Sequence, residues 1–283
     1  MTWLALILLV LAVAAGALFV LVRRRPDLGT DYAQRRIAAL AAAPAKPPLL
    51  LTEAHLAPLP APVQRYLRLT NSIGQPRVQS LQVAYDAEMF SKPGQPGMPG
   101  PAEQFNRFDT PRRLFFMRTR MFGLPVAVLH DYEGTRASMT VRVASLFNVV
   151  DLHGDALART ETVTLLNDQC FFAPSWFTDP RLAWQPIDDR HAGVTFTQGP
   201  HRVSATLEFN DAGELVNFSS DDRGALQKDG SLRLVRWSTP MRDYRDFEGR
   251  RVATRGEAIF HYPEGDFVYG RFILKQIRFD IQA

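Results

Sequence analysis

The stretch LEFNDAGELVNFSSDDR, residues 207–223, decides the fold class of this chain. Apolar and polar residues alternate on either side of Asn-Asp-Ala-Gly, which is the pattern of two half-buried strands joined by a tight turn. Strands joined by so short a connection run antiparallel. The charged tail, Asp221-Asp222-Arg223, is either the solvated end of the second strand or part of a polar site. We expect a functional role for Arg223 rather than for Asp221 and Asp222.

The same alternation recurs along most of the chain. The Gly/Pro-rich stretch at residues 91–101 is predicted to be a loop, and Thr-Pro at residues 239–240 a corner. So many strands with short connections predict one large antiparallel sheet. With the two strands of the hairpin included, strands are predicted at residues 81–89, 114–121, 125–132, 137–144, 194–197, 202–209, 214–219, 231–238, 251–262 and 267–281.

Two segments inside this region have the signature of helices. DALARTETVTLLNDQC, residues 155–170, begins with the capping residue Asp155 and ends before Pro174. A shorter helix is predicted at residues 62–70, because a proline is tolerated in the first turn of a helix. The predicted fold class is therefore α+β: a large, curved, half-barrel-like antiparallel sheet with a helix packed against it.

The first segment of the chain has the composition of a transmembrane helix. Residues 3–22 contain no charged residue, and as a helix they would extend about 30 Å, the thickness of a bilayer core. The alternative is a cleaved signal peptide with its cleavage site at the small residues 14–17, but a charged n-region is missing and arginines 23–25 follow at once. The positive-inside rule places these arginines, and the domain after them, on the cytoplasmic side of a bacterial inner membrane. A β-rich domain without a disulfide is compatible with either side, so an extracytoplasmic domain is the alternative.

The region between the membrane segment and the sheet, residues 23–58, is predicted to be a helical stalk followed by a proline-rich linker. The helix covers residues 31–43, and Arg35 and Arg36 on it are expected to face lipid headgroups. Residues 59–283 are then predicted to form a single β-rich domain. Because 46% of the residues are hydrophobic, such a domain has enough apolar side chains for a sizeable core.

Charge and cysteine content exclude several classes of protein. The chain has 33 basic and 29 acidic residues and a net charge of +4, without a concentrated basic stripe, so no nucleic-acid partner is predicted. The single cysteine, Cys170, excludes an internal disulfide and a cysteine-based zinc cluster. Its neighbours Phe171 and Phe172 favour a buried packing role for this thiol.

No standard catalytic motif is present. The sequence has no Gly-x-Ser-x-Gly elbow, P-loop, Gly-x-Gly-x-x-Gly or His-Glu-x-x-His, so no cofactor is predicted. His130 and Asp131 are adjacent on a predicted strand and therefore point to opposite faces. The strongest candidate for a metal or acid–base site is Asp-Asp-Arg-His at residues 188–191. Asp-Asp is also ordinary turn chemistry, and we predict no metal.

Aromatic residues point to a ligand pocket instead. They cluster directly after the 155–170 helix and again in the last third of the chain. Core packing is their simplest role, but a concave sheet lined by aromatic side chains is also typical of pockets for apolar ligands. The residues predicted to line the pocket are Trp176, Phe177, Trp237 and Tyr244, with Asp131 and Arg223 at its polar rim.

Six landmarks follow one another in a characteristic order: LPAPVQRYL, HDYEG, FFAPSWF, W-x-x-IDD, LEFNDAGELVNFSSDDR and Y-x-x-FEG. Through them residues 59–281 resemble a bacterial family of membrane-anchored proteins that is classed only as a domain of unknown function. The long strands around one helix are also similar to the half-barrel sheets of periplasmic lipoprotein carriers, which hold acyl chains. This resemblance implies an architecture and leaves the activity open.

Three functions are compatible with these observations. The first, which we predict, is a membrane-anchored binding module that holds a lipid or another amphiphile on a concave sheet face and has no enzymatic activity. The second is a membrane-bound hydrolase or isomerase, with Asp188, His191 or the pair Asp221 and Asp222 as acid and base. The third is an assembly or scaffold protein, which would expose a large apolar patch.

Overall fold

The computed structural model describes residues 3, 5–10, 13, 16, 27–41 and 49–281. Most of the predicted membrane segment, residues 3–22, lies outside the described residues, and so do arginines 23–25. Among the helices of the described part, none combines the length and the apolar character needed to span a membrane.

The described chain forms a few helices and many strands. The helices are α2 (Leu28–Ala41), α3 (Ala61–Leu69) and α4 (Asp155–Phe172), with short 3-10 helices η1 (Glu53–Leu56) and η2 (Pro174–Thr178). The strands are β1 (Ser80–Met89), β2 (Met98–Arg107), β3 (Arg112–Met121), β4 (Leu124–Glu133), β5 (Arg136–Val143), β6 (Phe147–His153), β7 (Leu182–Pro186), β8 (His191–Gln198), β9 (His201–Phe209), β10 (Leu215–Ser220), β11 (Gly224–Leu226), β12 (Leu232–Leu234), β13 (Trp237–Phe247), β14 (Arg250–Tyr262) and β15 (Gly265–Phe279).

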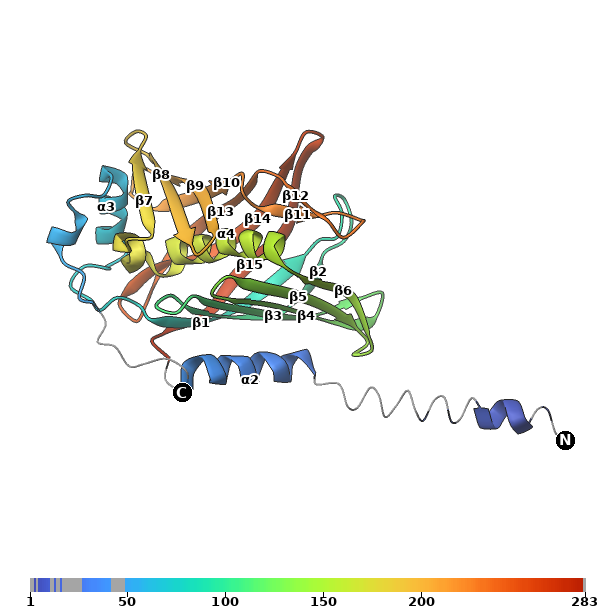
Figure 1. The fold of residues 1–283 in the computed structure, drawn as a ribbon. Helices are drawn as coiled ribbons and strands as arrows, with labels where there is room; N and C mark the ends of the chain where they lie inside the picture. Colours follow the sequence, from blue (N-terminus) through green and yellow to red (C-terminus); the bar gives the residue numbers. More distant parts are fainter. Residues whose placement is uncertain are drawn as a thin grey trace.

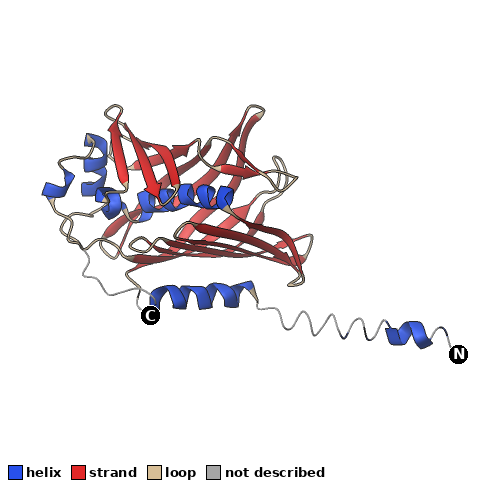
Figure 2. Cartoon of the chain, viewed as in Figure 1, coloured by secondary structure: helices blue, strands red, loops and turns tan. Residues whose placement is uncertain are grey.

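Thirteen of the strands in the described part form one antiparallel sheet, in the order β6-β5-β4-β3-β2-β1-β15-β14-β13-β10-β9-β8-β7. The sheet curves so that β1–β6 lie below and β7–β10 lie above, with α4 in the hollow between them (Figure 1). Figure 2 shows the same helix enclosed by strands. The predicted α+β fold, a large antiparallel sheet with a helix packed on it, is confirmed.

Helix α4 bonds to both halves of the sheet. Tyr132 of β4 and Thr162 share a hydrogen bond of 3.0 Å between their hydroxyls, and the Asn167 amide donates to the hydroxyl of Thr239 on β13 at 2.5 Å. Because the helix is enclosed, almost all of its residues are buried, polar ones included. This explains why its sequence has no clean apolar stripe, and it requires the buried polar side chains to find partners inside the protein.

The hairpin predicted around residues 210–213 is confirmed, and its two strands are β9 and β10. In its turn the Gly213 amide donates to the Asn210 carbonyl at 2.9 Å, and the Glu214 amide donates to the Asn210 side-chain oxygen at 2.9 Å. Gly213 has a φ of 83°, a left-handed conformation that glycine adopts without a steric penalty.

Strand β2 begins inside the predicted Gly/Pro-rich loop, so the prediction for residues 98–101 was wrong. Gly100 is the reason that the strand can form there, because a Cβ at this position would lie 1.9 Å from the backbone oxygen of Arg118 on β3. The corner predicted at residues 239–240 is also absent, since β13 continues through Pro240, which pairs with Asn217. Strands β2, β6, β7 and β11 were not predicted, and the single strand predicted at 231–238 is divided between β12 and β13.

Helix α2 packs on the outer, convex face of β3 and β4 (Figure 1). Its Tyr32 is buried and stacks on Phe116, with ring centroids 5.7 Å apart. Arg35 forms an ion pair with Asp131, and Arg36 donates to the side chain of Gln82 at 2.7 Å. These two arginines therefore bind the sheet and not lipid headgroups, contrary to the expectation from the sequence.

The predicted linker contributes to the core. Leu51 and Leu56 are fully buried in the main hydrophobic cluster, together with Val63, Tyr66 and Leu67 of α3. Helix α3 buries Val63, Tyr66 and Leu67, which lie on one face at i, i+3, i+4 spacing, and the Tyr66 hydroxyl donates to the Cys170 carbonyl at 3.1 Å.

Candidate functional site

The candidate site is a cavity between α4 and the concave face of the sheet. The space between its walls measures about 800 Å³, open mouth and adjoining solvent included. One part of its wall is apolar, and another carries an unusual number of buried charged and polar groups. The apolar wall consists mainly of Met89, Phe115, Phe172, Met241 and Phe272.

The apolar wall is built across the middle of the sheet. Phe272 of β15 meets Tyr85 of β1 edge-on at 5.7 Å and Phe115 of β3 at 6.3 Å between ring centroids. Met89 and Met241 are half-buried next to these rings. Methionine side chains are flexible and polarisable, so this wall can adapt to the shape of an apolar group.

The polar wall is organised by one buried arginine. The Arg113 guanidinium forms ion pairs with Asp168 at 2.7 Å and Glu161 at 3.1 Å, and it donates to the Gln104 side chain at 3.4 Å. Asn106 also donates to Asp168, at 3.0 Å. Because all these groups are buried, their mutual hydrogen bonds offset the cost of removing them from water.

Glu161 joins this network to a histidine. His130 Nδ1 lies 3.1 Å from one oxygen of Glu161, while Arg113 holds the other. Burial alone would raise the pKa of Glu161, but His130, Arg113 and Arg223 together lower it to about 2. The carboxylate is therefore ionised at every physiological pH and fixes the orientation of the imidazole.

Arg223 contacts α4 at Thr160 and Thr164, next to these carboxylates, and has a different environment from Arg113. Its guanidinium stacks on the Trp237 ring, 4.4 Å from the centroid, and donates to the Thr160 carbonyl at 3.3 Å and to the Thr164 hydroxyl. The Tyr269 hydroxyl accepts from both Arg223 and Trp237, at 3.3 and 3.1 Å. Arg223 is only 8% exposed, its Nε has no partner, and it makes no ion pair with a carboxylate in the described part of the chain.

Two of the residues predicted to line a pocket do so. Trp237 and Arg223 both line the cavity. The stretch at residues 207–223 therefore ends in a residue that lines the cavity, and its charged tail is more than the solvated end of a strand. The flanking carboxylates have other roles, since Asp222 pairs with Arg159 on the outside of α4 and Asp221 is exposed.

The other three aromatic residues predicted for the pocket lie in the core beyond it. Trp176 packs on Phe108, and Phe177 packs on Trp184 with ring centroids 4.9 Å apart. The Tyr244 hydroxyl donates to the Leu215 carbonyl at 2.7 Å. Aromatic content alone does not distinguish a cavity wall from a core, which is why these residues were misplaced. Cys170 is fully buried, as predicted, and burial raises the pKa of its thiol.

Asp131 was predicted at the rim of the pocket and lies on the opposite face of the sheet. It binds Arg35 of α2 and Arg112 of β3, outside the cavity. The neighbouring His130 faces the cavity in its place. The prediction that His130 and Asp131 face opposite ways is confirmed. Asp131 was the residue predicted for the rim of the pocket, but His130 is the one that lines the cavity.

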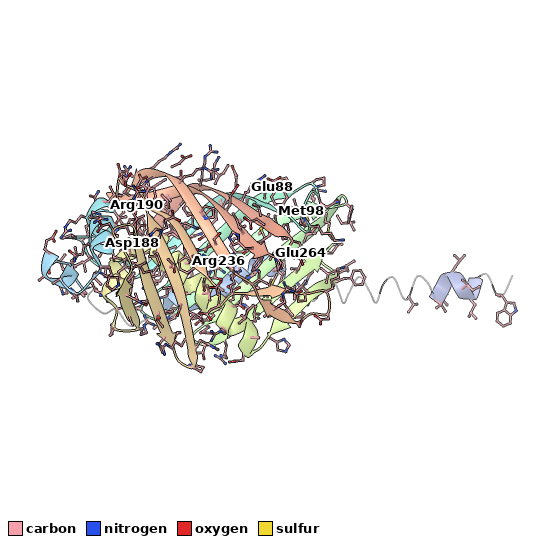
Figure 3. The ribbon with its side chains drawn as sticks, turned by 90° about the horizontal axis from the view of Figure 1, so that it is seen from above. Glu88, Met98, Asp188, Arg190, Arg236 and Glu264 are labelled. Carbon is pink, nitrogen blue, oxygen red and sulfur yellow. The ribbon has the colours of Figure 1, made fainter. Side chains whose placement is uncertain are left out.

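The acid–base residues proposed for a hydrolase do not converge. Asp188 and His191 bond to each other at 2.9 Å in the exposed turn between β7 and β8. In Figure 3, Asp188 and Arg190 lie toward one end of the domain, whereas Glu88, Met98 and Glu264 lie toward the other end. Asp221 and Asp222 are on a separate loop after β10. This dispersal removes the geometric basis for that reaction centre.

The residues that the sequence reasoning missed are Arg113, Glu161 and Asp168. One signal was available, because Arg113 alternates with Phe115 and Met117 and so occupies the buried phase of its strand. A charged residue in that phase requires a buried partner. The partners on α4 are 48 and 55 residues away in the chain, and no local pattern identifies them.

Comparison with solved structures gives distant similarities. A LolA superfamily protein from Nitrosomonas europaea is 10% identical, with a TM-score of 0.42 and a match over 78% of this chain and 94% of that one. A DUF1329 family protein from Desulfovibrio piger is 12% identical, with a TM-score of 0.41 over 79% of this chain and 93% of that one. Neither similarity identifies a ligand for this chain.

Comparison by sequence is more informative. No curated protein matches the chain. The family described as a family of unknown function, DUF6544, matches residues 50–272, which include all six ordered landmarks in the sequence. The match extends over most of the chain, and the chain therefore belongs to the DUF6544 family.

Proposed function

We propose that this protein binds an amphiphile with an acidic headgroup in the cavity between α4 and the sheet. Arg223 holds the headgroup, and the methionine and phenylalanine wall holds the apolar part. The observation that carries the proposal is a buried guanidinium at a cavity wall that has no carboxylate partner among the described residues.

An unpaired buried cation is costly, and a bound anion would remove that cost. The effective penalty for burying a charge is several kcal/mol in proteins, and it is offset only by close pairing. The partners of Arg223 are neutral: two hydroxyls, a carbonyl and the Trp237 ring. A carboxylate or phosphate would form the charge-assisted hydrogen bonds that these neutral groups cannot supply.

The other buried arginine is not available in the same way. Arg113 already binds two carboxylates, so its charge is neutralised within the protein. The cavity therefore combines one arginine that makes two direct ion pairs with one, Arg223, that makes none in the described part of the chain and interacts with the charge of Glu161 only without direct contact. This asymmetry favours a single acidic group at the Arg223 side and an apolar remainder near Phe272 and Met89.

Membrane anchoring is a second part of the proposal. The uncharged residues 3–22 would tie the domain to a bilayer, and the arginines that follow favour the cytoplasmic side. An anchored domain can take its amphiphile from the adjacent leaflet. The anchor would keep the cavity close to a high local concentration of ligand.

One observation supports an enzymatic alternative. His130 lines the cavity, and Glu161 orients its ring through Nδ1, which is the arrangement of a general base in many hydrolases. In this alternative His130 and Glu161 replace Asp188 and His191 as the acting pair. Turnover of a bound ester, lost in His130→Gln while binding persists, would support it over simple binding.

The binding proposal is tested by measuring a fluorescent fatty acid against the full chain in detergent. Substitution of Arg223 by Leu should weaken binding about 10- to 100-fold, the loss expected for hydrogen bonds to a charged group. Arg223→Lys keeps the positive charge but loses the paired N–H donors of the guanidinium. Its affinity for the fatty acid should therefore lie between that of the parent and that of Arg223→Leu. The matched control, Arg190→Leu, removes an exposed arginine at the distant β7–β8 turn and should bind as the parent does.

Native mass spectrometry of the purified protein gives a second readout. The parent should carry an acidic lipid, and Arg223→Leu should carry less of it at an unchanged melting temperature. Equal affinity of the parent and Arg223→Leu for the fatty acid, or an equally strong preference for a neutral amphiphile, would contradict the proposal.

A further inference from the structure

Two hairpin tips project apolar side chains at one end of the sheet. The turn between β3 and β4 and the turn between β5 and β6 lie at the same end, because consecutive antiparallel strands reverse direction. Phe122 is 96% exposed and Phe147 62% exposed, and Leu124 and Val149 beside them are also exposed. Large apolar side chains gathered at the tips of neighbouring hairpins mark an interaction surface.

Phe122 is also in an unfavourable backbone conformation. It has a φ of 50°, and Gly123 after it has a φ of 81°, as in a two-residue hairpin turn of type I′. That turn favours Asn-Gly, because Asn tolerates a positive φ far better than a bulky aromatic residue does. The exposed ring therefore contributes nothing to the stability of the turn, and an asparagine would serve the hairpin better.

The two hairpin ends themselves carry positive charge, and the acidic groups Asp27 and Asp151 lie beside them. Residues 117–130 and 137–150, which form the two hairpin ends, contain Arg118, Arg120 and Arg142 and no acidic residue. Arg118 and Arg120 are exposed. Exposed aromatic side chains next to arginines are the combination found where proteins rest on a membrane with anionic lipids.

The chain enters the domain at this same end. Helix α2 begins beside Arg118, whose guanidinium lies 3.4 Å from the Asp27 carboxylate, and its later residue Ala39 accepts from Arg107 at the other end of the strands. Five peptide units separate residue 22, the last of the uncharged segment, from Asp27, so the two are at most about 18 Å apart. A membrane segment at residues 3–22 would thus deliver the hairpin tips to the bilayer surface.

The concave face of the sheet is apolar from these tips to the cavity. Val126 and Val128 alternate with the cavity residue His130 along β4, and they pair with Val143 and Val141 on β5. Paired residues share a face of the sheet. A ligand that leaves the bilayer at the tips would therefore meet no charged side chain on these two strands before His130.

We propose that the β3–β4 and β5–β6 hairpin tips form a docking surface that inserts Phe122 and Phe147 into the headgroup region of a bilayer with anionic lipids. The docked domain stands with its strands pointing at the membrane, α2 along its outer face and the apolar concave face open toward the lipid. This inference does not depend on which ligand the cavity binds, because it concerns only the contact between the hairpin tips and the bilayer.

The test places a fluorescent label near the tips of the full chain. Leu124→Cys is labelled at the tip and Arg136→Cys at the start of β5, at the opposite end of the hairpins, while the native Cys170 is buried and should not react. Each protein is reconstituted at one chain per nanodisc, with brominated phosphatidylcholine and phosphatidylglycerol in equal parts. The brominated acyl chains should quench the label at position 124 and leave the label at position 136 unaffected.

A second variant separates docking from folding. Phe122→Asn should abolish most of the quenching at position 124 while the melting temperature stays the same or rises. The matched control, Ile187→Asn, changes an exposed apolar residue at the distant β7–β8 turn and should leave the quenching intact. Loss of quenching when phosphatidylglycerol is omitted would identify the part played by the arginines.

Three outcomes would overturn the proposal. Equal quenching at positions 124 and 136 would show that the domain has no fixed orientation. Full quenching in Phe122→Asn would show that the tip does not enter the lipid. Shielding of position 124 that appears only with two chains per nanodisc would assign the surface to a second copy of the chain.

Discussion

The strongest quantitative prediction concerns Arg113, which lies between two buried carboxylates. Replacing it with Met keeps much of its volume and removes its charge, leaving Glu161 and Asp168 without their shared cation. Breaking a buried ion pair from one side typically costs about 3–5 kcal/mol. We therefore expect the free energy of unfolding of Arg113→Met to be lower by that amount at pH 7.

The pH dependence gives this prediction its specific signature. The folded-state pKa of Glu161 is about 2, against 4.5 for an ordinary Glu side chain, and the difference corresponds to about 3 kcal/mol of stability. Because the folded-state pKa is the lower one, this stability is fully present above pH 4.5 and disappears as the pH falls toward 2. In Arg113→Met the pKa of Glu161 rises, so the variant has less of this stability to lose.

The assay is urea unfolding of the full chain in detergent micelles at a series of pH values from 7 to about 3. The gap between parent and Arg113→Met should be largest at neutral pH and should narrow as the solution is acidified. Arg118→Met, which removes an exposed arginine from the opposite face of the same strand, should cost less than about 1 kcal/mol. A gap that stays constant with pH would refute the reasoning, because it would mean that Arg113 contributes by packing and not by charge.

Two further predictions concern the sheet and the helix on its outer face. Gly100→Ala should lower the free energy of unfolding by about 1–3 kcal/mol, since its Cβ would meet backbone of β3. Gly97→Ala should cost less, because its Cβ meets only the movable Glu88 side chain, and equal losses in urea unfolding would contradict this account. Tyr32→Ala should release α2 from the sheet, with faster hydrogen exchange in residues 28–41 and unchanged protection of α4. Faster exchange in both helices would show that α2 is not a separately stabilised element.

The hairpins and the long helix could be predicted because their signals are local. The alternation around residues 210–213 and the acidic start at Asp155 are both contained within a few residues, and the structure has a hairpin and a helix there. Asp155 is the first residue of the helix and not its cap, because the N-cap position is Gly154 and no side chain caps it. Strand β2 was missed for the same reason, since Pro99, Gly100 and Pro101 locally favour a loop. What allows a strand there is the backbone of β3, which is not a local property.

The cavity could be predicted only in part because its contents come from distant parts of the chain. Trp237 and Arg223 were identified by composition, and Arg223 stood out as a charge at the end of a regular strand. Whether Trp176 lines a cavity or a core depends on Phe108, which packs on it from another strand end. The pairing of Arg113 with Glu161 depends on how α4 lies across the sheet, which sequence periodicity does not encode.

The pairing of β1 with β15 has a consequence for how the protein folds. These are the first and last strands that the structure describes, and Leu81 pairs with Phe279 across the seam. Contacts between residues so far apart in sequence carry a large loop-closure cost and form late, whereas the hairpins on either side can form early. The Tyr85 and Phe272 rings meet across that seam to form part of the cavity wall. During synthesis the cavity therefore cannot exist before β15 has left the ribosome and paired, so ligand binding would report the final step of folding.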